Sequence, residues 1–97
     1  MFEYTNEDIE KALSGYFTSQ EPLVLREFPS KQKRQHIVLN IILNQFEKGR
    51  KYTEKEVNDI LCEIYPDYVT LRRSLIDYKL MDRTRNCSEY WVKEKEN

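Results

Sequence analysis

The sequence predicts a mainly α-helical domain with a small β-hairpin, a winged helix-turn-helix-like domain that carries one extra N-terminal helix. Glycine and proline are scarce, at 2 and 3 of 97 residues, and 34% of the residues are charged, which suits a helical soluble domain. Two short segments begin with the helix-capping residues Thr53 and Asp67, and two strand-like segments follow them. Helix, helix and hairpin in that order are typical of a helix-turn-helix with a wing.

The first expected helix begins after Thr5. Thr5 and Asp8 have the spacing of a capping box, in which each side chain accepts a hydrogen bond from the backbone N–H of the other residue. Apolar residues recur at helical spacing up to Tyr16, and Gly15 can end the helix. The apolar run Leu23–Arg26 then predicts a short strand.

The second expected helix is the central one. We expect Ser30 to cap it and the helix to run to about Phe46, with Gly49 stopping the chain beyond. The segment Ile37–Leu43 is apolar nearly all round and is broken only by Asn40. Such a helix is buried on more than one side, so it should lie in the middle of the domain.

The third expected helix follows a short linker or strand at Lys51–Thr53. Thr53 and Glu56 form a second capping box at its start, and Pro66 closes it because proline cannot continue a helix. Its apolar residues fall on one face: Val57, Ile60, Leu61 and Ile64.

The fourth helix and the hairpin complete the expected fold. Asp67 is expected to cap a helix that runs to about Tyr78. Met81–Thr84 and Glu89–Lys93 then predict two strands around a polar turn at residues 85–88.

Bulk properties bound the setting of the protein. The length predicts one core, which we divide into an N-terminal helical extension, residues 1–23, and a winged-helix-like domain, residues 24–97. No apolar run approaches the roughly 20 residues that cross a bilayer, and the first residues lack a secretory signal. Cys62 and Cys87 are expected to be reduced rather than paired or bound to zinc. We therefore expect a cytoplasmic protein with no membrane partner.

Charge is unevenly distributed along the chain. The net charge is −1, but residues 1–28 carry −4, residues 29–55 carry +5 and the remainder carries −2. An anionic partner is therefore expected to meet the middle of the chain.

The two adjacent arginines of the fourth helix are expected to have different roles. At about 100° per residue, Arg72 projects toward the edge of the core, where a charge must be paired to be tolerated. We expect it to reach Glu56 or Asp59 and to hold the two helices together. Arg73 projects outward, where it either meets a phosphate or a guanine edge or is simply solvated beside Asp77.

A nucleic-acid contact would use side chains of the fourth helix, of the segment around the start of the third helix and of the wing. The fourth helix would face bases, the second group would hold phosphates, and wing arginines would enter a minor groove or grip phosphates. The expected contact residues are Thr70, Arg73, Ser74, Arg50, Lys51, Lys55, Arg83 and Arg85.

A second candidate site lies in the first turn of the central helix, where the cations Lys31, Lys33 and Arg34 follow Ser30. Cations at this position oppose the helix dipole by roughly 0.3–1 kcal/mol each, whereas the free backbone N–H groups attract anions. Either the side chains extend into water, or the site holds a phosphate or a carboxylate.

The sequence offers little for catalysis. His36 is the only histidine, and we expect it on the helix surface or at the edge of the core. There is no glycine-rich phosphate loop, no nucleophile motif and no cluster with metal-ligand spacing. We expect no enzymatic activity, no cofactor and no metal.

Several of these segments together resemble the small prokaryotic family named domain of unknown function 2087. The resemblance covers roughly residues 24–93 and implies a regulatory setting in a bacterial or phage cytoplasm, because such domains occur in bacterial proteins described as candidate transcriptional regulators. They often follow a separate DNA-binding helix-turn-helix, and the family implies no mechanism. The similar segments are Leu25–Pro29, Lys31–Arg34, Tyr52–Asn58, Leu71–Asp77, Arg83 and Tyr90-Trp91.

The first interpretation is a standalone winged-helix-type domain that binds nucleic acid, duplex DNA before other forms, as a transcriptional regulator. A homodimer would suit two half-sites, with Phe2, Tyr4, Tyr16 and Phe17 as the expected contact. The alternative is a protein-interaction or anionic-ligand-sensing module of a regulatory system with no direct DNA contact. The near-zero net charge favours this alternative.

Overall fold

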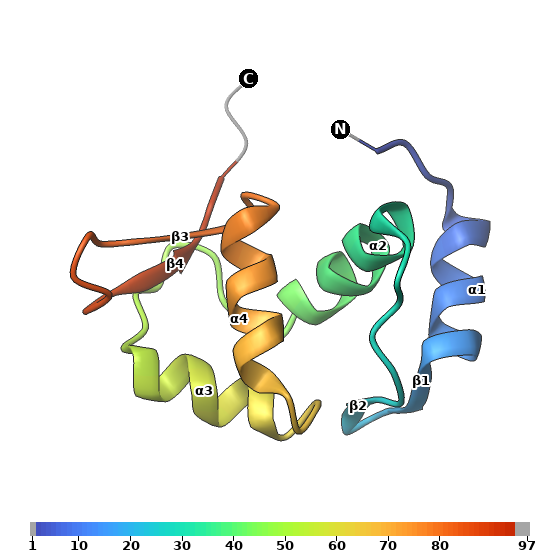
Figure 1. The fold of residues 1–97 in the computed structure, drawn as a ribbon, viewed down its shortest axis with the longest axis horizontal. Coiled ribbons are helices and arrows are strands. Elements are labelled where there is room, and N and C mark those ends of the chain that lie inside the picture. Colours follow the sequence, from blue (N-terminus) through green and yellow to red (C-terminus); the bar gives the residue numbers. More distant parts are fainter. Residues whose placement is uncertain (1, 95–97) are drawn as a thin grey trace.

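The structure is a computed structural model and describes residues 2–94. Within these residues, the fold combines four helices with two small antiparallel sheets of two strands each (Figure 1). The helix-rich fold with a C-terminal hairpin is confirmed, and the first sheet is an addition to it. The elements are α1 Asn6–Tyr16, β1 Phe17–Gln20, β2 Leu23–Leu25, α2 Gln32–Leu43, α3 Glu54–Cys62, α4 Tyr68–Asp77, β3 Met81–Arg83 and β4 Tyr90–Val92.

The first helix, α1, begins where the capping box predicts. The backbone N–H of Thr5 donates to Asp8 Oδ2 at 2.9 Å, and the N–H of Asp8 donates to Thr5 Oγ1 at 3.3 Å. Gly15 does not end the helix, which continues to Tyr16 and passes directly into β1. β1 pairs with β2 antiparallel, with Phe17 opposite Leu25. The sequence did not predict β1, because its FTSQ segment has no apolar run of its own.

The helix α2 is central, as predicted. Ile37, Val38, Leu39 and Ile42 are each at most 4% exposed, since α1 packs on one side of α2 and α4 on another (Figure 1). Asn40, the one polar break in this segment, donates its side-chain amide to the backbone carbonyl of His36 at 3.0 Å. The middle turn of α2, residues 36–39, is therefore buried on every side, which explains its apolar sequence, whereas residues 32–34 are exposed.

Both predicted ends of α2 are wrong. The N-cap is Lys31, which makes no side-chain cap bond, rather than Ser30. The first helical bond joins the N–H of Gln35 to the carbonyl of Lys31 at 2.9 Å, so the chain turns one residue later than expected. At the other end the helix stops at Leu43, because the bonds that follow span three residues and tighten the chain toward Phe46.

The helices α3 and α4 begin where predicted. Thr53 and Glu56 exchange backbone-to-side-chain bonds of 2.9 and 3.1 Å, and Asp67 accepts the backbone N–H of Thr70 at 3.3 Å. The predicted apolar residues are buried, apart from the half-buried Ile60, but α3 ends at Cys62, earlier than predicted, so Ile64 lies beyond it. The residues of α3 and α4 with no exposed surface are Val57, Leu61, Leu71 and Leu75.

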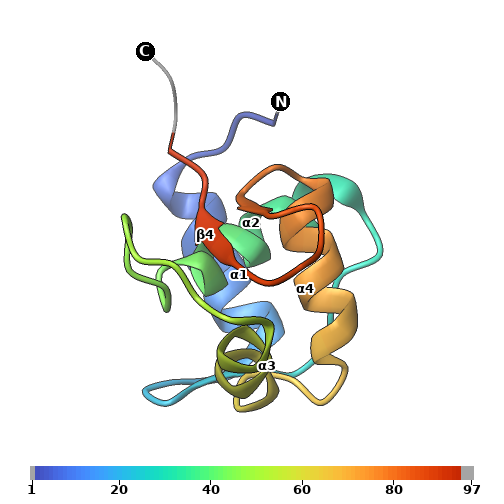
Figure 2. The same ribbon diagram turned by 90° about the vertical axis from the view of Figure 1, so that its left-hand side faces the viewer.

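The predicted hairpin of β3 and β4 is present, and Tyr52 extends it. Arg83 pairs with Tyr90, while Tyr52 and Tyr90 exchange backbone bonds of 2.8 and 2.7 Å on the other edge of β4. β4 therefore lies between β3 and Tyr52, in front of α2 in the side view (Figure 2). Because side chains alternate along a strand, Tyr90 and Val92 are buried and Trp91 faces the other way.

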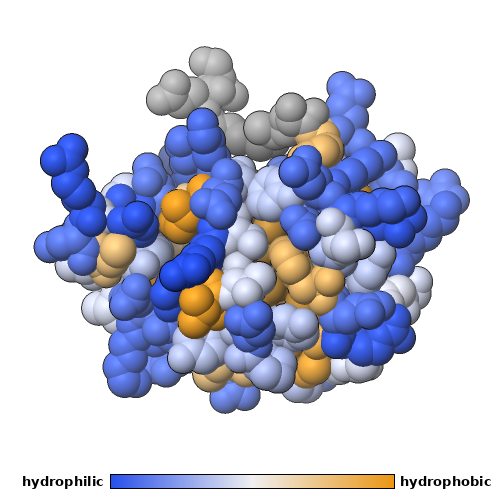
Figure 3. All heavy atoms as spheres, in the orientation of Figure 1, coloured by the Kyte–Doolittle hydropathy of each residue, from blue (hydrophilic) through white to orange (hydrophobic). Residues whose placement is uncertain are grey.

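One face of the molecule is mainly polar (Figure 3). The face in Figure 3 is largely hydrophilic, and hydrophobic side chains reach it only in small patches. Within residues 2–94, no helix has the length and apolar character that a bilayer span requires.

Candidate nucleic-acid interface and anion sites

A groove of about 390 Å³ lies between α4 and the β3–β4 hairpin. Arg72 and Arg73 line it from α4, and Arg83 lines it from β3, so the expected recognition helix and the expected wing contribute cations to one concave surface. Glu54 and Asp77 also line the groove, which therefore carries three guanidinium groups and two carboxylates. The remaining lining residues are Ile76, Cys87 and Tyr90.

Arg72 holds α3 and α4 together, as predicted. Its side chain is 18% exposed, its Nη1 donates to Asn58 Oδ1 at 2.5 Å, and its Nε lies 3.7 Å from Glu54 Oε1. The predicted partners Glu56 and Asp59 are wrong. Glu54 and Asn58 are four residues apart, so they lie on one stripe of α3, and this stripe is the one turned toward α4.

Glu54 also binds the hairpin. The Tyr90 hydroxyl donates to Glu54 Oε1 at 3.0 Å, which places a residue of β4 and Arg72 of α4 on the same carboxylate. Burial of the phenol, followed by its hydrogen bond to Glu54 and its contact with Cys87, raises the pKa of Tyr90 to about 12. One side chain at the start of α3 therefore joins three elements beneath the groove.

The three residues of α4 that were expected to face bases differ in their exposure and in their contacts. The Arg73 side chain is exposed and makes no hydrogen bond or ion pair with any residue in 2–94. Thr70 instead donates its hydroxyl to Asp67 Oδ2 at 2.7 Å, so this side chain serves the cap of α4. Ser74 is half-buried, with its backbone carbonyl accepting the N–H of Tyr78 at 2.9 Å.

The three expected phosphate-binding residues around the start of α3 each lie beside a carboxylate. The pairs are Arg50 with Glu56 at 3.2 Å, Lys51 with Glu89 at 4.0 Å and Lys55 with Asp59 at 2.8 Å. All three pairs are on the surface, where an ion pair contributes about 0–1 kcal/mol. A phosphate could therefore replace these carboxylates at small cost.

The wing arginines differ from each other. Arg83 folds back on the turn, where its Nη1 donates to the carbonyls of Thr84 at 3.2 Å and Arg85 at 3.4 Å. Arg85 is exposed, and its own side chain makes no hydrogen bond or ion pair within the described residues. In the sheet, Arg83 of β3 lies directly opposite Tyr90 of β4. The Lys51 ammonium lies 5.2 Å from the centre of the ring of the next residue, Trp91.

Because Tyr90 and Trp91 face opposite sides of the sheet, Lys51 and Arg83 also lie on opposite sides. The structure thus brings Arg73 and Arg83 together and separates Lys51 from them.

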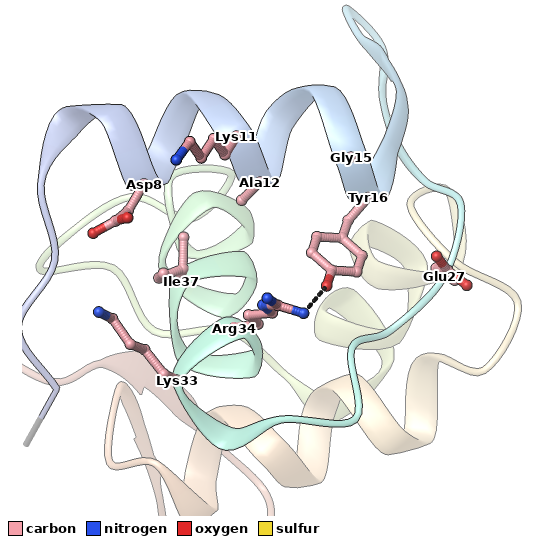
Figure 4. Close-up of a pocket in the computed structure, with 9 residues that line it drawn as sticks. All are labelled: Asp8, Lys11, Ala12, Gly15, Tyr16, Glu27, Lys33, Arg34 and Ile37. Carbon is pink, nitrogen blue, oxygen red and sulfur yellow. Dashed lines mark hydrogen bonds between the residues drawn. The ribbon is translucent and has the colours of Figure 1, made fainter.

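A cleft of about 550 Å³ between α1 and α2 contains half of the predicted anion cluster (Figure 4). Lys33 and Arg34 line it, while Ser30 and Lys31 do not. Lys33 points toward Asp8 of α1, and Arg34 Nη1 lies 3.5 Å from the hydroxyl of Tyr16 (Figure 4). Lys11, Ala12, Gly15, Glu27 and Ile37 complete the lining.

Asp8 of α1 places a negative charge near one of the cations at the start of α2, Lys33. The backbone hydrogen bond from Thr5, and then the nearby charge of Lys33, hold the pKa of Asp8 below its usual value. The carboxylate that faces Lys33 is therefore supplied by the chain itself, across the contact between α1 and α2. The sequence had offered only water or an external anion as the partner of this cation.

The sequence missed a third cavity, and His36 is one of the residues that line it. This residue is 5% exposed, so it lies deeper than the helix surface or core edge that was expected. Phe2, Tyr4 and Tyr78 surround its ring, and these neighbours come from distant parts of the chain. Phe2 and Tyr4 are half-buried beside this ring and Phe17 is 6% exposed, and the expected dimer stays a prediction.

The described part of the chain contains no cluster of metal-binding side chains. No three His, Cys, Asp or Glu side chains within residues 2–94 gather in a way that could hold a metal ion. Cys62 and Cys87 are both free thiols.

The fold and its grooves define a small helix-rich domain whose last helix and terminal hairpin share an arginine-lined surface. Residues 24–92 match the family described as "Uncharacterized protein conserved in bacteria (DUF2087)". The chain belongs to this family. The comparisons with curated proteins and with solved structures found no match.

Proposed function

We propose that this protein is a winged-helix-type domain that binds duplex nucleic acid, DNA in particular, in the setting of transcription regulation. The observation that carries the proposal is the groove in which Arg73 of α4 and Arg83 of β3 lie together. A helix and a wing that contribute cations to one surface suit a helix in a major groove with a hairpin on the adjacent backbone.

The connections of the small sheet support the winged-helix part of the proposal. Tyr52 lies between α2 and α3 in the sequence, and it pairs with β4 rather than with β3. The strand order is therefore Tyr52, β4, β3, which places the last strand in the centre as in a winged helix. The helices α2, α3 and α4 would then be the three helices of that fold, with α1 as an addition.

Each cation would have a distinct role on the duplex. Arg73, exposed and without a partner in residues 2–94, would reach a phosphate or the O6 and N7 atoms of guanine, with Ser74 beside it. Arg85 would extend from the hairpin turn into a minor groove or to a phosphate. Arg50 and Lys55 would exchange their surface carboxylates for phosphates, whereas Lys51, on the other side of the sheet, would have no part in this contact.

Fluorescence anisotropy with a labelled random-sequence duplex tests the proposal. At about 150 mM salt we expect a Kd of roughly 1–100 µM, the usual range of non-specific binding, and tighter binding as the salt concentration is lowered. Arg73→Met should weaken binding about tenfold and reduce the salt slope by about one, because one phosphate contact is lost. Lys31→Met, which removes an exposed cation outside the groove, is the matched control and should have a smaller effect.

Two results would overturn the nucleic-acid proposal. The first is the absence of binding below about 100 µM at low salt, since even non-specific duplex binders reach that affinity. The second is equal binding by wild type and Arg73→Met, because α4 would then not face the duplex.

A second candidate function is that of a regulatory module that binds a small anionic ligand or an acidic protein segment without contacting DNA. The cleft between α1 and α2 favours it, because Lys11, Lys33 and Arg34 line one concave surface there. Under this alternative, phosphate-bearing metabolites would raise the Tm of the wild type, and Lys33→Gln would remove the shift. No shift with any such ligand, together with duplex binding, would eliminate it.

A further inference from the structure

A groove of about 950 Å³ lies beside His36 and has no role in either proposed function. Its walls come from the N-terminal segment 2–4, one side of α2, the end of α4 and the end of β4. The volume is near the upper end of the roughly 300–1,000 Å³ that small-molecule sites occupy. None of the expected nucleic-acid or anion-binding residues lines it.

One part of this groove is aromatic. The rings of Phe2, Tyr4 and Tyr78 lie 5.4, 5.8 and 5.7 Å from the ring of His36, measured between ring centres. These separations are those of packed aromatic pairs, so the four rings form one cluster. Asn40 lies beside it, with its side-chain amide nitrogen 3.3 Å from His36 Nδ1. The wall therefore offers ring faces and edges to a planar group.

Cations line the same groove. Lys48, Lys79 and Lys93 are exposed and make no ion pair with any carboxylate in the described residues, whereas Glu3 and Glu94 are the acidic lining residues. The described residues that line the groove therefore carry an excess of one positive charge. That balance suits a ligand with an anionic group better than a neutral or cationic one.

Lys79 has an unusual backbone conformation. It lies just beyond α4 with φ of 61°, and it belongs to a turn in which the N–H of Lys79 bonds to Ile76 at 2.9 Å and the N–H of Leu80 bonds to Leu75 at 3.0 Å. Glycine is the usual residue at this position, because a Cβ is strained in the left-handed region. Local folding alone would thus favour glycine, yet the chain has a lysine whose side chain lines the groove.

We propose that this groove binds a small molecule in which a planar aromatic ring carries an anionic group. Tyr78 and Lys79 are adjacent in the chain and both line the groove, so one small ligand can meet a ring and an ammonium group together. The ring would pack on Tyr78 and Tyr4, and the anionic group would bind Lys79. Aromatic carboxylates and nucleotides share this chemistry, and the test separates them.

An NMR titration that follows the ring signals of His36 and Tyr78 tests the proposal. Benzoate and adenosine 5′-monophosphate are the two probes, and inorganic phosphate and adenosine supply the charge and the ring separately. At least one probe should shift these signals saturably below about 10 mM and bind about tenfold more tightly than either separate group. Binding of benzoate alone identifies an aromatic acid site, and binding of the nucleotide alone identifies a nucleotide site.

Lys79→Gly is the decisive variant, because it removes the ammonium group while relieving the backbone strain. Its Tm should equal or exceed that of the wild type, so a loss of binding could not result from unfolding. We expect at least about tenfold weaker binding of the probe, a change of one logarithmic unit in Kd. Lys31→Gly removes a lysine outside the groove and should bind the probe as the wild type does.

Three outcomes would overturn the proposal. One is that neither probe saturates below about 10 mM, and another is that inorganic phosphate binds as tightly as the nucleotide or benzoate. The third is that Lys79→Gly retains wild-type affinity. Since the groove shares no lining residue with the proposed duplex interface, none of these outcomes depends on whether the protein binds DNA.

Discussion

Replacing Arg72 with methionine tests whether this arginine connects α3 and α4. Methionine has a similar helix propensity and keeps the unbranched aliphatic stem, so the change removes mainly the guanidinium group. The lost contacts are the 2.5 Å bond to Asn58 and the 3.7 Å contact with Glu54. Glu54 keeps its hydrogen bond from Tyr90, so its carboxylate is not left without a partner.

The expected magnitude follows from these contacts. A hydrogen bond from a charged group contributes about 1.5–3 kcal/mol, and the 18% exposure of this side chain leaves little water to replace it. We therefore expect Arg72→Met to lower the free energy of unfolding by about 2 kcal/mol. For a domain of this size, such a change lowers the Tm by roughly 10 °C.

Urea denaturation followed by circular dichroism measures the effect, and Arg73→Met is the matched control. This neighbour makes the same chemical change on an exposed part of the same helix, so its effect should stay within about 0.5 kcal/mol. Asn58→Ala alone and combined with Arg72→Met completes a double-mutant cycle. Coupling of at least about 0.5 kcal/mol is expected between residues in direct contact.

The reasoning would be refuted if Arg72→Met and Arg73→Met had equal effects on stability, or if the effects of Arg72→Met and Asn58→Ala were simply additive. Either result would mean that the guanidinium of Arg72 does not hold α3 against α4.

Two further predictions concern stability and pH. Glu56→Ala should destabilise the protein at pH 7, because the backbone bond from Thr53 and then the charge of Arg50 lower the pKa of Glu56 from its ordinary 4.5. The stabilisation by the Glu56 carboxylate is complete above pH 4.5 and is lost as the pH falls through the lowered pKa. Thermal denaturation should therefore show the Tm values of the variant and the wild type converging in acid. A difference in Tm that does not change with pH would contradict this. Tyr90→Phe should cost about 0.5–1.5 kcal/mol near pH 8 through the lost bond to Glu54. The pKa of the phenol is raised from 10.0 to about 12, so its stabilisation of the fold is complete below pH 10 and is lost as the pH rises toward 12. If the stabilities of the wild type and Tyr90→Phe changed in parallel between pH 8 and pH 12, the hydrogen bond to Glu54 would not have this role.

The starts of α1, α3 and α4 could be predicted from the sequence because helix caps are local. The boxes at Thr5 and Thr53 and the cap at Asp67 each join groups three residues apart, so the residues concerned specify the bonds wherever the helix lies. Ser30 shows the limit of the same rule. A residue suited to capping lies one position before the true N-cap Lys31, and the path of the chain decides which of them is used.

The candidate sites were predicted only in part, for a related reason. The spacing of apolar residues placed Arg72 inward and Arg73 outward, because both directions follow from the helix repeat. The partner of Arg72 could not be predicted, since the choice between Glu54 and Glu56 depends on how α3 is rotated against α4. Likewise, nothing near Lys33 in the sequence indicated that Asp8 of α1 would face it.

The sequence by itself determined the helix-rich fold, the hairpin, the central position of α2 and the directions of Arg72 and Arg73, because these depend on capping and periodicity within a few residues. Only the tertiary structure decided which side chains share a surface. Arg73 and Arg83 line one groove, Lys51 lies on the other side of the sheet, and Tyr78 and Lys79 line a second groove with His36. Such arrangements bring together different helices and strands. Their positions depend on how whole helices pack, and no local pattern records that packing.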